Sequence, residues 1–221
     1  MDRARILGVI LAGGASRRFG RDKGAALLGG RTVLEWVVER ARPQVDCLLL
    51  NANDPAVGKG MRNLERLPDS SPGEGPLAGI LAALAEAERW AHVHVASFAC
   101  DTPFFPTDTV ARLATMLESS PADYAVASCG AAAHRIFALW PVTCRAQLEH
   151  AFANNTRSLR DLEHWLEPTW ADFAPEGGPD GDPFFNINTR DDLETAERWL
   201  AECPGSQPWL QRCASNKLRV T

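Results

Sequence analysis

Ile6-Leu-Gly-Val-Ile-Leu-Ala-Gly-Gly14, near the start of the chain, is the stretch of sequence that decides the fold. Its first six residues are an apolar run, which is typical of a strand buried on both faces of a parallel sheet. The run passes directly into Gly13 and Gly14. Because glycine lets the backbone turn sharply and bring its N–H groups close to a ligand, this order predicts a phosphate-binding turn at the end of a strand.

The segment after the turn adds hydrogen-bond donors and positive charge through Ser16, Arg17 and Lys23. It is not a Walker A loop, since Lys23 follows Asp22 and precedes Gly24 rather than Ser or Thr. It also lacks the GxGxxG spacing of dinucleotide-binding loops. The alternative is a glycine-rich connection with solvated arginines. So many polar and glycine residues directly after a buried strand favour a nucleotide phosphate site.

Short apolar runs alternate with helical patterns along the rest of the chain. The expected strands cover residues 6–11, 47–50, 64–67, 92–99, 123–127, 135–140 and 170–173. The expected helices cover residues 32–42, 77–89, 106–118, 143–152, 158–166 and 189–202, and residues 175–183 form a loop with no reason to pack. This alternation predicts an α/β fold with a mostly parallel sheet covered on both faces. Ligands of such sheets bind beyond the carboxyl ends of the strands.

The composition fits one globular domain, expected at residues 1–202, followed by an extension of uncertain order at residues 203–221. The net charge of −5 argues against a general nucleic-acid binder, which needs a basic face. No apolar run approaches the roughly 18 residues of a membrane span. The six cysteines form no CxxC pair, so we expect reduced thiols in a cytoplasmic protein.

Polar side chains follow several of the predicted strands. Asp101 comes just after the strand at 92–99, and its carboxylate suits Mg²⁺, which prefers one or two carboxylates together with phosphate oxygens and water. Asp69 could bind nucleotide or hold a metal-bound water. Asn51 and Asn53 could present a donor and an acceptor to a ribose or base edge. Turn formation is the alternative for Asp101 and for both asparagines.

Asn186 and Asn188 are two residues apart, so on an extended segment their side chains point the same way. Turn capping is the alternative for this pair too. His92 and His94 have the same spacing, but two histidines without a third ligand do not predict a zinc site.

The first block resembles the signature L-A-G-G-x-S-x-R-x-G-x-D-K of nucleotidyltransferases, and the chain as a whole resembles the molybdenum cofactor guanylyltransferases, the MobA family. The other blocks that carry the resemblance, in the family's order, are Asn51-Ala-Asn53, Leu67-Pro-Asp69, Gly75-Pro-Leu-Ala-Gly79, Cys100-Asp-Thr-Pro103 and Asn186-Ile-Asn-Thr189. Together they span residues 6–200. Phe19 stands where the family usually has methionine, and the tail after Cys203 is not covered by the resemblance.

This resemblance implies a Rossmann-like, three-layer nucleotidyltransferase fold with a mostly parallel mixed sheet. It also implies a Mg²⁺-dependent enzyme that transfers GMP from GTP to molybdenum-molybdopterin, forming the guanine dinucleotide cofactor and releasing pyrophosphate. A cytidylyltransferase or sugar-phosphate nucleotidyltransferase of the same fold is one alternative, and a non-catalytic nucleotide-binding module is another. The implied partners are GTP, molybdopterin, and molybdenum-insertion proteins or recipient molybdoenzymes, with no nucleic acid and no membrane.

The residues expected to do this work fall into four sets. The expected catalytic residues are Arg17, Lys23 and Asp101. The expected GTP-binding residues are Leu11, Ala12, Gly13, Gly14, Ser16, Lys23, Asn51, Asp69, Gly75, Pro76, Leu77, Gly79 and Asp101. Asp101 is also the expected Mg²⁺ ligand, and Asn186 and Asn188 are expected near the acceptor or the metal.

Overall fold

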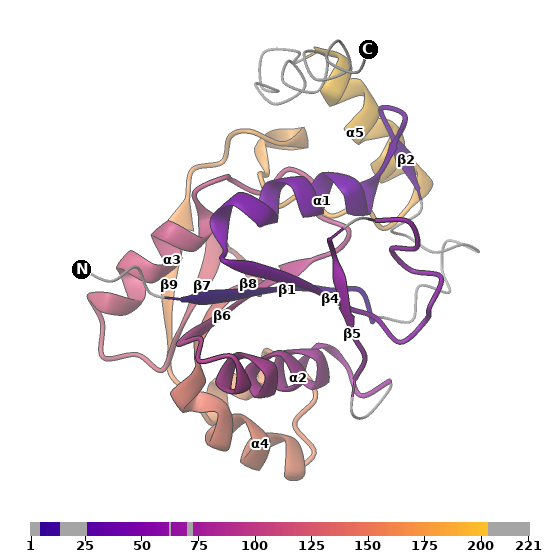
Figure 1. Cartoon of the computed structure of the whole chain (residues 1–221). Coiled ribbons are helices and arrows are strands. Elements are labelled where there is room, and N and C mark those ends of the chain that lie inside the picture. Colours follow the sequence, from indigo (N-terminus) through magenta and orange to yellow (C-terminus); the bar gives the residue numbers. More distant parts are fainter. Residues whose placement is uncertain (1–4, 14–25, 62, 70–72, 203–221) are drawn as a thin grey trace.

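The apolar run at the start of the chain forms an inner strand of a seven-stranded sheet in the computed structural model (Figure 1). The structure describes residues 5–13, 26–61, 63–69 and 73–202. The strands are β1 (Ile6–Leu11), β2 (Leu27–Leu28), β3 (Arg31–Thr32), β4 (Cys47–Asn51), β5 (Glu65–Leu67), β6 (His94–Ala99), β7 (Tyr124–Cys129), β8 (Ala132–Pro141) and β9 (Pro168–Phe173). The α-helices are α1 (Val33–Ala41), α2 (Pro76–Arg89), α3 (Thr109–Glu118), α4 (Arg145–Ala153) and α5 (Arg190–Glu202). The short 3₁₀ helices of the described residues are η3 (Arg42–Gln44), η4 (Val142–Cys144), η5 (Asp161–His164) and η6 (Pro179–Gly181).

The sheet is mixed but mostly parallel, in the order β5-β4-β1-β6-β8-β7-β9, and β2 and β3 form a separate hairpin. Strands β5, β4, β1 and β6 run parallel to one another, and β8 is antiparallel to both of its neighbours. In register, Leu11 lies beside Asn51 of β4 on one side and Ala99 of β6 on the other. The last residues of the parallel strands therefore meet at a single edge of the sheet.

Helices cover both faces of the sheet, which gives the predicted three layers. Helices α1 and α3 lie on one face and α2 and α4 on the other (Figure 1). The alternation of side chains along a strand explains the two cores. Ile10 faces the α1 and α3 side, whereas Val9 and Leu11 face the α2 and α4 side.

Local sequence sets where the helices begin. Thr32 and Glu35 form the predicted capping box of α1, in which each side chain binds the other residue's backbone N–H. Thr189 and Asp192 cap α5 in a related way: Asp192 N donates to Thr189 Oγ1, and Thr189 N donates to the Asp192 carboxylate. Both starts match the sequence-based predictions.

The structure differs from the predicted elements in several places. The loop at 175–183 packs rather than hanging free, since Gly178, Pro179 and Pro183 are buried and Pro179 begins η6. The helix expected at 158–166 shrinks to η5, and the strand expected from 92 begins at His94. Strand β8 starts three residues earlier than expected because it continues out of a tight hairpin with β7.

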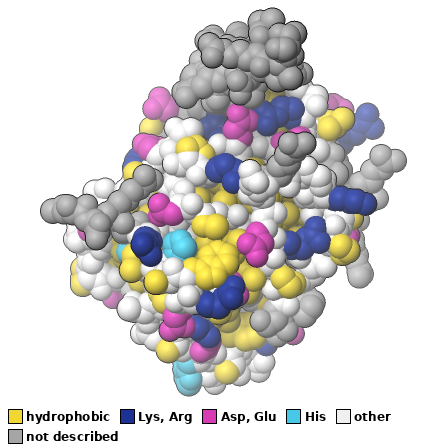
Figure 2. Space-filling model, viewed as in Figure 1, with side chains coloured by type: hydrophobic (Ala, Val, Ile, Leu, Met, Phe, Trp, Pro, Cys, Tyr) yellow, Lys and Arg dark blue, Asp and Glu magenta, His cyan; other side chains and the backbone are white. Residues whose placement is uncertain are grey.

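Among the described residues, no helix combines the length and the apolarity that a bilayer crossing requires. On the face shown in Figure 2, the described acidic and basic side chains are interspersed around a central apolar area. The proposed extension at 203–221 lies outside the described residues.

Candidate active site

Backbone hydrogen bonds continue past the strand ends and tie three loops together at this edge of the sheet. Ala12 N donates to Asn51 O over 2.9 Å, just after β1 ends. Ala52 N donates to Leu67 O over 3.2 Å, just after β4 ends. The loops that carry the predicted nucleotide residues thus lie side by side.

Asn51, Asn53 and Asp69 form one hydrogen-bonded cluster at this edge. The buried Asn51 side chain donates to Asp69 Oδ1 over 2.7 Å and to Leu67 O over 3.0 Å. Asn53 Nδ2 donates to Asp69 Oδ2 over 2.8 Å, and Asp69 N donates back to Asn53 Oδ1 over 2.8 Å. Asn51 therefore turns its amide nitrogen inward to hold the Asp69 loop. Turn formation was the alternative role for Asn51 and Asn53. In this loop the side chain that forms such a turn is Asp54, whose carboxylate accepts from Ala56 N.

Two glycines let other chain segments approach this cluster. A Cβ atom at position 79 of α2 would lie 2.3 Å from Asn51 Oδ1 and 2.9 Å from Leu11 Cδ2. At position 13 a Cβ atom would lie 3.3 Å from Asp69 Oδ2 and 3.5 Å from Asn51 Oδ1. The structure therefore brings together Gly13, Asn51, Asp69 and Gly79, which are far apart in the sequence.

The N-terminus of α2 faces the same edge. Gly75 has a φ of 81° and precedes Pro76, which starts the helix at a position where a missing N–H group is tolerated. The first turn of a helix carries N–H groups without intrahelical partners and a partial positive charge, which suit a phosphate or a carbonyl oxygen. The Leu77 side chain is fully buried in the core, so only the backbone of Leu77 is available to a ligand.

Arg157 holds the turn before α2 from outside. Its guanidinium pairs with Glu74 and also donates to Phe152 O over 2.6 Å and to Thr156 O over 3.1 Å. The Arg157 carbonyl oxygen would lie 3.2 Å from a Cβ atom at position 75. The segment that contains Arg157 therefore fits against the backbone of the Gly75 turn.

Asp101 and the asparagine segment are joined directly. Ile187 N donates to Asp101 O over 2.9 Å, which fixes the Asn186-Ile-Asn188 segment beside the half-buried Asp101. Ile187 is buried, and Asn186 and Asn188 on either side of it are exposed, as an extended segment requires. Asn188 also contributes its N–H to the Asp192 carboxylate at the start of α5.

A cavity of about 540 Å³ opens beside this segment, and we call it the strand-end cavity. Its wall comes from α2, from the end of β6, from the start of β8 and from the segments around residues 158–160 and 182–186. Six of its lining residues are Pro76, Thr102, His134, Arg160, Asp182 and Asn186. A pocket of this size with a few polar groups suits a small-molecule ligand.

His134 and Asp182 are the titratable pair in the cavity wall. His134 Nε2 lies 3.7 Å from Asp182 Oδ1, and the ring stacks on Phe184 with a centroid distance of 4.5 Å. Burial lowers the pKa of His134, against the nearby Asp182 charge, which raises it. The sequence alone does not predict this pairing, because the two residues meet only through the packing of the 175–183 loop.

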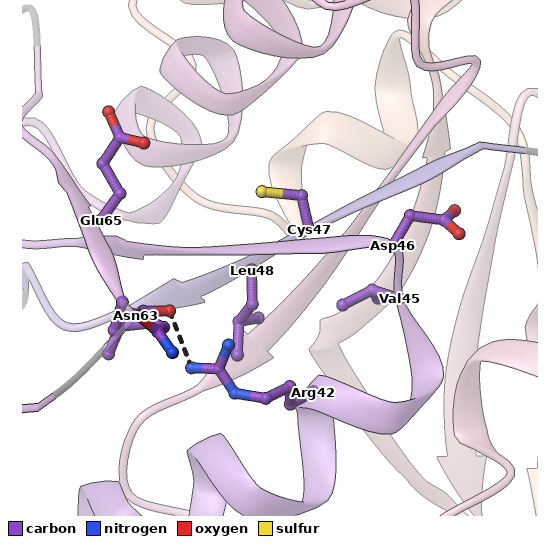
Figure 3. Close-up of a pocket in the computed structure, with 8 residues that line it drawn as sticks. Arg42, Val45, Asp46, Cys47, Leu48, Asn63 and Glu65 are labelled. Carbon is purple, nitrogen blue, oxygen red and sulfur yellow. Dashed lines mark hydrogen bonds between the residues drawn. The ribbon is translucent and has the colours of Figure 1, made fainter.

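A second cavity, of about 480 Å³, lies at the opposite edge of the sheet, where β4 and β5 begin (Figure 3). Arg42 there donates to Asn63 O over 3.0 Å, and Asp46 accepts from Ile6 N over 2.8 Å. None of the predicted site residues lines it. We therefore place the candidate active site at the strand ends and not in this cavity.

Four predicted site residues, Gly14, Ser16, Arg17 and Lys23, lie outside the described residues. In the part of the chain that is described, no three His, Cys, Asp or Glu side chains gather into a metal site. A single carboxylate such as Asp101 still fits Mg²⁺, because this ion keeps several waters and takes its other ligands from substrate phosphates.

Comparisons with known proteins agree with this geometry. Residues 8–169 match the family model of the MobA-like NTP transferase domain. A molybdenum cofactor guanylyltransferase of Rhizobium johnstonii is 41% identical over 205 residues, which cover 90% of this chain and 95% of the relative. One of Rhizobium meliloti is 43% identical over 209 residues, which cover 90% and 94%.

Solved structures show the same fold. The molybdopterin-guanine dinucleotide biosynthesis protein A of Archaeoglobus fulgidus superposes with a TM-score of 0.72 at 24% identity, covering 89% of this chain and 99% of that one. A 4-diphosphocytidyl-2C-methyl-D-erythritol synthase of Anaerococcus prevotii has a TM-score of 0.62 at 13% identity, covering 90% and 99%. The strand-end cluster, the family model and the close relatives together show that this chain belongs to the MobA-like NTP transferase family, among the molybdenum cofactor guanylyltransferases.

Proposed function

We propose that this protein transfers GMP from GTP to the phosphate of molybdenum-molybdopterin, forming the guanine dinucleotide cofactor and releasing pyrophosphate. The observation that carries the proposal is the convergence of Gly13, Asn51, Asp69 and Gly79 at one sheet edge, next to a cavity large enough for an acceptor. The names of the relatives supply the identity of the two substrates.

The nucleotide would lie over the ends of β1, β4 and β5. The backbone of Leu11, Ala12 and Gly13 and the first turn of α2, from Gly75 to Gly79, offer N–H and C=O groups there. Guanine presents an O6 acceptor beside N1 and N2 donors, and backbone groups of two tight loops can match that pattern. The Asn51 amide nitrogen binds Leu67 O and Asp69, which keeps these loops together beside the nucleotide.

The acceptor would occupy the strand-end cavity. A phosphate oxygen of molybdopterin attacks the α-phosphorus of GTP, the bond to the β-phosphate oxygen breaks, and pyrophosphate leaves. The chain's part is alignment and charge neutralisation, as in other phosphoryl-type transfers, with no covalent enzyme intermediate. Arg17 and Lys23 would face the triphosphate and the leaving pyrophosphate.

Asp101 would hold Mg²⁺, which when bound neutralises charge on the phosphate oxygens. Asp101 follows β6, the neighbour of β1, and its backbone oxygen binds the Asn186 segment, so its carboxylate could meet the phosphates of both substrates. We include the cytoplasm as the location, and molybdenum-insertion proteins or recipient molybdoenzymes as partners, in the same proposal.

The test is pyrophosphate release from GTP with Mg²⁺ and molybdopterin, followed by mass spectrometry of the dinucleotide product. GTP and CTP at equal concentration then compete, and we expect GTP to be used preferentially. A preference for CTP would replace the guanylyl assignment with the cytidylyl alternative. Absence of turnover with every nucleotide would favour the non-catalytic alternative.

Lys23→Ala provides a second test, based on the sequence. The substitution removes a donor that would stabilise the negative charge developing on the phosphate oxygens in the transition state. It should lower kcat by about 10²–10³-fold while leaving the circular dichroism spectrum unchanged. Arg17→Ala should have a smaller effect, because Arg18 and Arg21 lie on the same stretch of chain. An effect of Lys23→Ala below about fivefold would remove Lys23 from the catalytic residues.

A further inference from the structure

The Asp182 carboxylate is fixed in the wall of the strand-end cavity with one oxygen engaged. Phe184 N donates to Asp182 Oδ1 over 2.8 Å, and the same oxygen lies 3.7 Å from His134 Nε2. Within the described residues, Oδ2 accepts no hydrogen bond. The Asp182 side chain keeps 37% of its surface exposed, so Oδ2 is available to a ligand in the cavity.

Aromatic packing makes this part of the wall rigid. The His134 ring stacks on Phe184 at an interplanar angle of 25°. Phe184 in turn packs against Phe137 at 4.9 Å and against Phe173 at 5.2 Å between ring centroids. The carboxylate therefore projects from a surface that cannot easily rearrange.

His134 is part of this wall and is not itself a ligand-binding group. Its Nε2 atom is buried and has no hydrogen-bond partner among the described residues, with Asp182 Oδ1 facing it at 3.7 Å. Its side chain is only 16% exposed. Since burial lowers the pKa of His134, this ring carries no positive charge at neutral pH that would neutralise Asp182.

A carboxylate that His134 does not neutralise, beside an aromatic wall, favours a particular kind of ligand group. A phosphate would be repelled by Asp182, whereas a heterocycle with an amino group next to a ring N–H can donate to it. The pterin part of molybdopterin has such an edge, formed by its 2-amino group and N3–H. The cavity also runs toward Thr102, next to Asp101, where a phosphate could lie away from Asp182.

We propose that Asp182 is the specificity-determining residue for the acceptor, taking hydrogen bonds from the 2-amino group and N3–H of the pterin, and that His134 is a positioning residue for this carboxylate. The inference rests on the proposed function for the identity of the acceptor. It concerns recognition of the ring, so it can be tested separately from phosphate transfer.

The first experiment uses the unmodified full chain and no turnover. Calorimetric titration compares 6-hydroxymethylpterin with the matching lumazine, in which the 2-amino group is replaced by an oxygen that faces the carboxylate as an acceptor. We expect pterin to bind roughly 10- to 100-fold more tightly, the range for hydrogen bonds to a charged group. Equal affinities, or no binding of either compound at millimolar concentration, would overturn the proposal.

The second experiment uses Asp182→Asn, with Asp180→Asn as the matched control. Asp180 lies in the same loop, is exposed, and has a φ of 54° that asparagine tolerates. We expect Asp182→Asn to remove most of the preference for pterin and to raise KM for molybdopterin about tenfold or more, while the affinity for GTP stays unchanged. Asp180→Asn should behave like the native protein.

The role of His134 is tested by the split between KM and kcat. His134→Gln should raise KM for molybdopterin and leave kcat and KM for GTP unchanged, since it acts through Asp182. A fall in kcat with both KM values unchanged would assign His134 to structure alone.

The two proposals fail in different ways. If Asp182→Asn keeps the pterin preference while GMP transfer proceeds normally, the inference is wrong and the proposed function stands. If pterin is preferred but no pyrophosphate is released from GTP, the inference stands for a pterin ligand and the proposed function is wrong.

Discussion

A missing side chain at Gly79 allows the nucleotide side of the site to form. The helix that carries Gly79 passes so close to Asn51 that no Cβ atom fits between them. The Asn51 amide nitrogen, in turn, donates hydrogen bonds to Leu67 O and to the Asp69 carboxylate. The position of Asp69 at the sheet edge thus depends on a glycine ten residues further along the chain.

Gly79→Ala should therefore damage both stability and nucleotide binding. Pushing a methyl group against Asn51 overpacks the site, which typically costs roughly 1–3 kcal/mol in the free energy of unfolding. We expect this loss in urea denaturation, together with weaker GTP binding by calorimetry. In the Asn51→Ala/Gly79→Ala double variant the contact with Asn51 disappears and only the flexible end of Leu11 remains at 2.9 Å, so the combined loss of stability should be smaller than the sum of the two single losses, while GTP binding stays weak. Additive losses in the double variant would contradict this account.

Asp101→Asn tests the proposed metal ligand. Asparagine keeps the size of the side chain but loses the charge that a hard cation needs. We expect activity at fixed Mg²⁺ to fall by ~100-fold or more, with partial recovery as the Mg²⁺ concentration rises. The thermal midpoint should change little. Equal activity of the variant and the native protein would make Asp101 a structural residue.

The start of helix α2 acquires its position from another element. Arg157 reaches the Glu74 carboxylate from the segment after α4, and the Arg157 guanidinium also lies 4.0 Å from the Phe152 ring centroid. Both partners of the ion pair are partly exposed, so the pair adds at most about 1 kcal/mol to stability. Its larger effect should be on the shape of the Gly75 turn.

Glu74→Gln is therefore expected to raise KM for GTP about two- to fivefold with almost no change in the thermal midpoint. Arg157→Lys should do the same, because lysine cannot replace the forked contacts to Phe152 O and Thr156 O. The two changes combined should have little more effect than either alone. Glu88→Gln breaks an ion pair with Arg145 at the other end of the same helix and should leave KM for GTP unchanged.

The stability of the whole molecule should decrease in mildly acidic solution. Burial lowers the pKa of His92, His94 and His134 below the ordinary value of 6.5. The unfolded chain therefore binds more protons than the native protein below that pH, and the free energy of unfolding falls as the pH is lowered through and below 6.5.

Urea denaturation at pH 7.5, 6.0 and 5.0 measures this slope. His94 is one source, since its Nδ1, like His92 Nδ1 and His134 Nε2, is buried without a hydrogen-bond partner in the described part of the chain. His94→Gln should flatten the dependence on pH. A stability that rises on acidification would show that these histidines gain partners when protonated.

The fold could be predicted from the sequence because its strands and helix caps are encoded locally. The apolar run at 6–11 and the Thr32–Glu35 box depend on neighbours a few residues away, and both were confirmed. The adjacency of Asn51 and Asp69 follows from their places after two predicted strands, whereas the approach of Gly79 to Asn51 was not predicted. Two contacts of the site could not be predicted, namely Arg157 with Glu74 and His134 with Asp182. Both join residues that are far apart in the sequence through the packing of irregular loops.

The order of the strands has a consequence for self-association. A sheet ends in two strands whose outer backbone groups can pair with another molecule, the usual starting point for aggregation. Here one end is β5, which has only three residues, and the other is β9, which begins with a proline that lacks an N–H group. Both ends are therefore poor templates for an added strand. The short length of β5 protects one edge of the sheet, and Pro168 at the start of β9 protects the other.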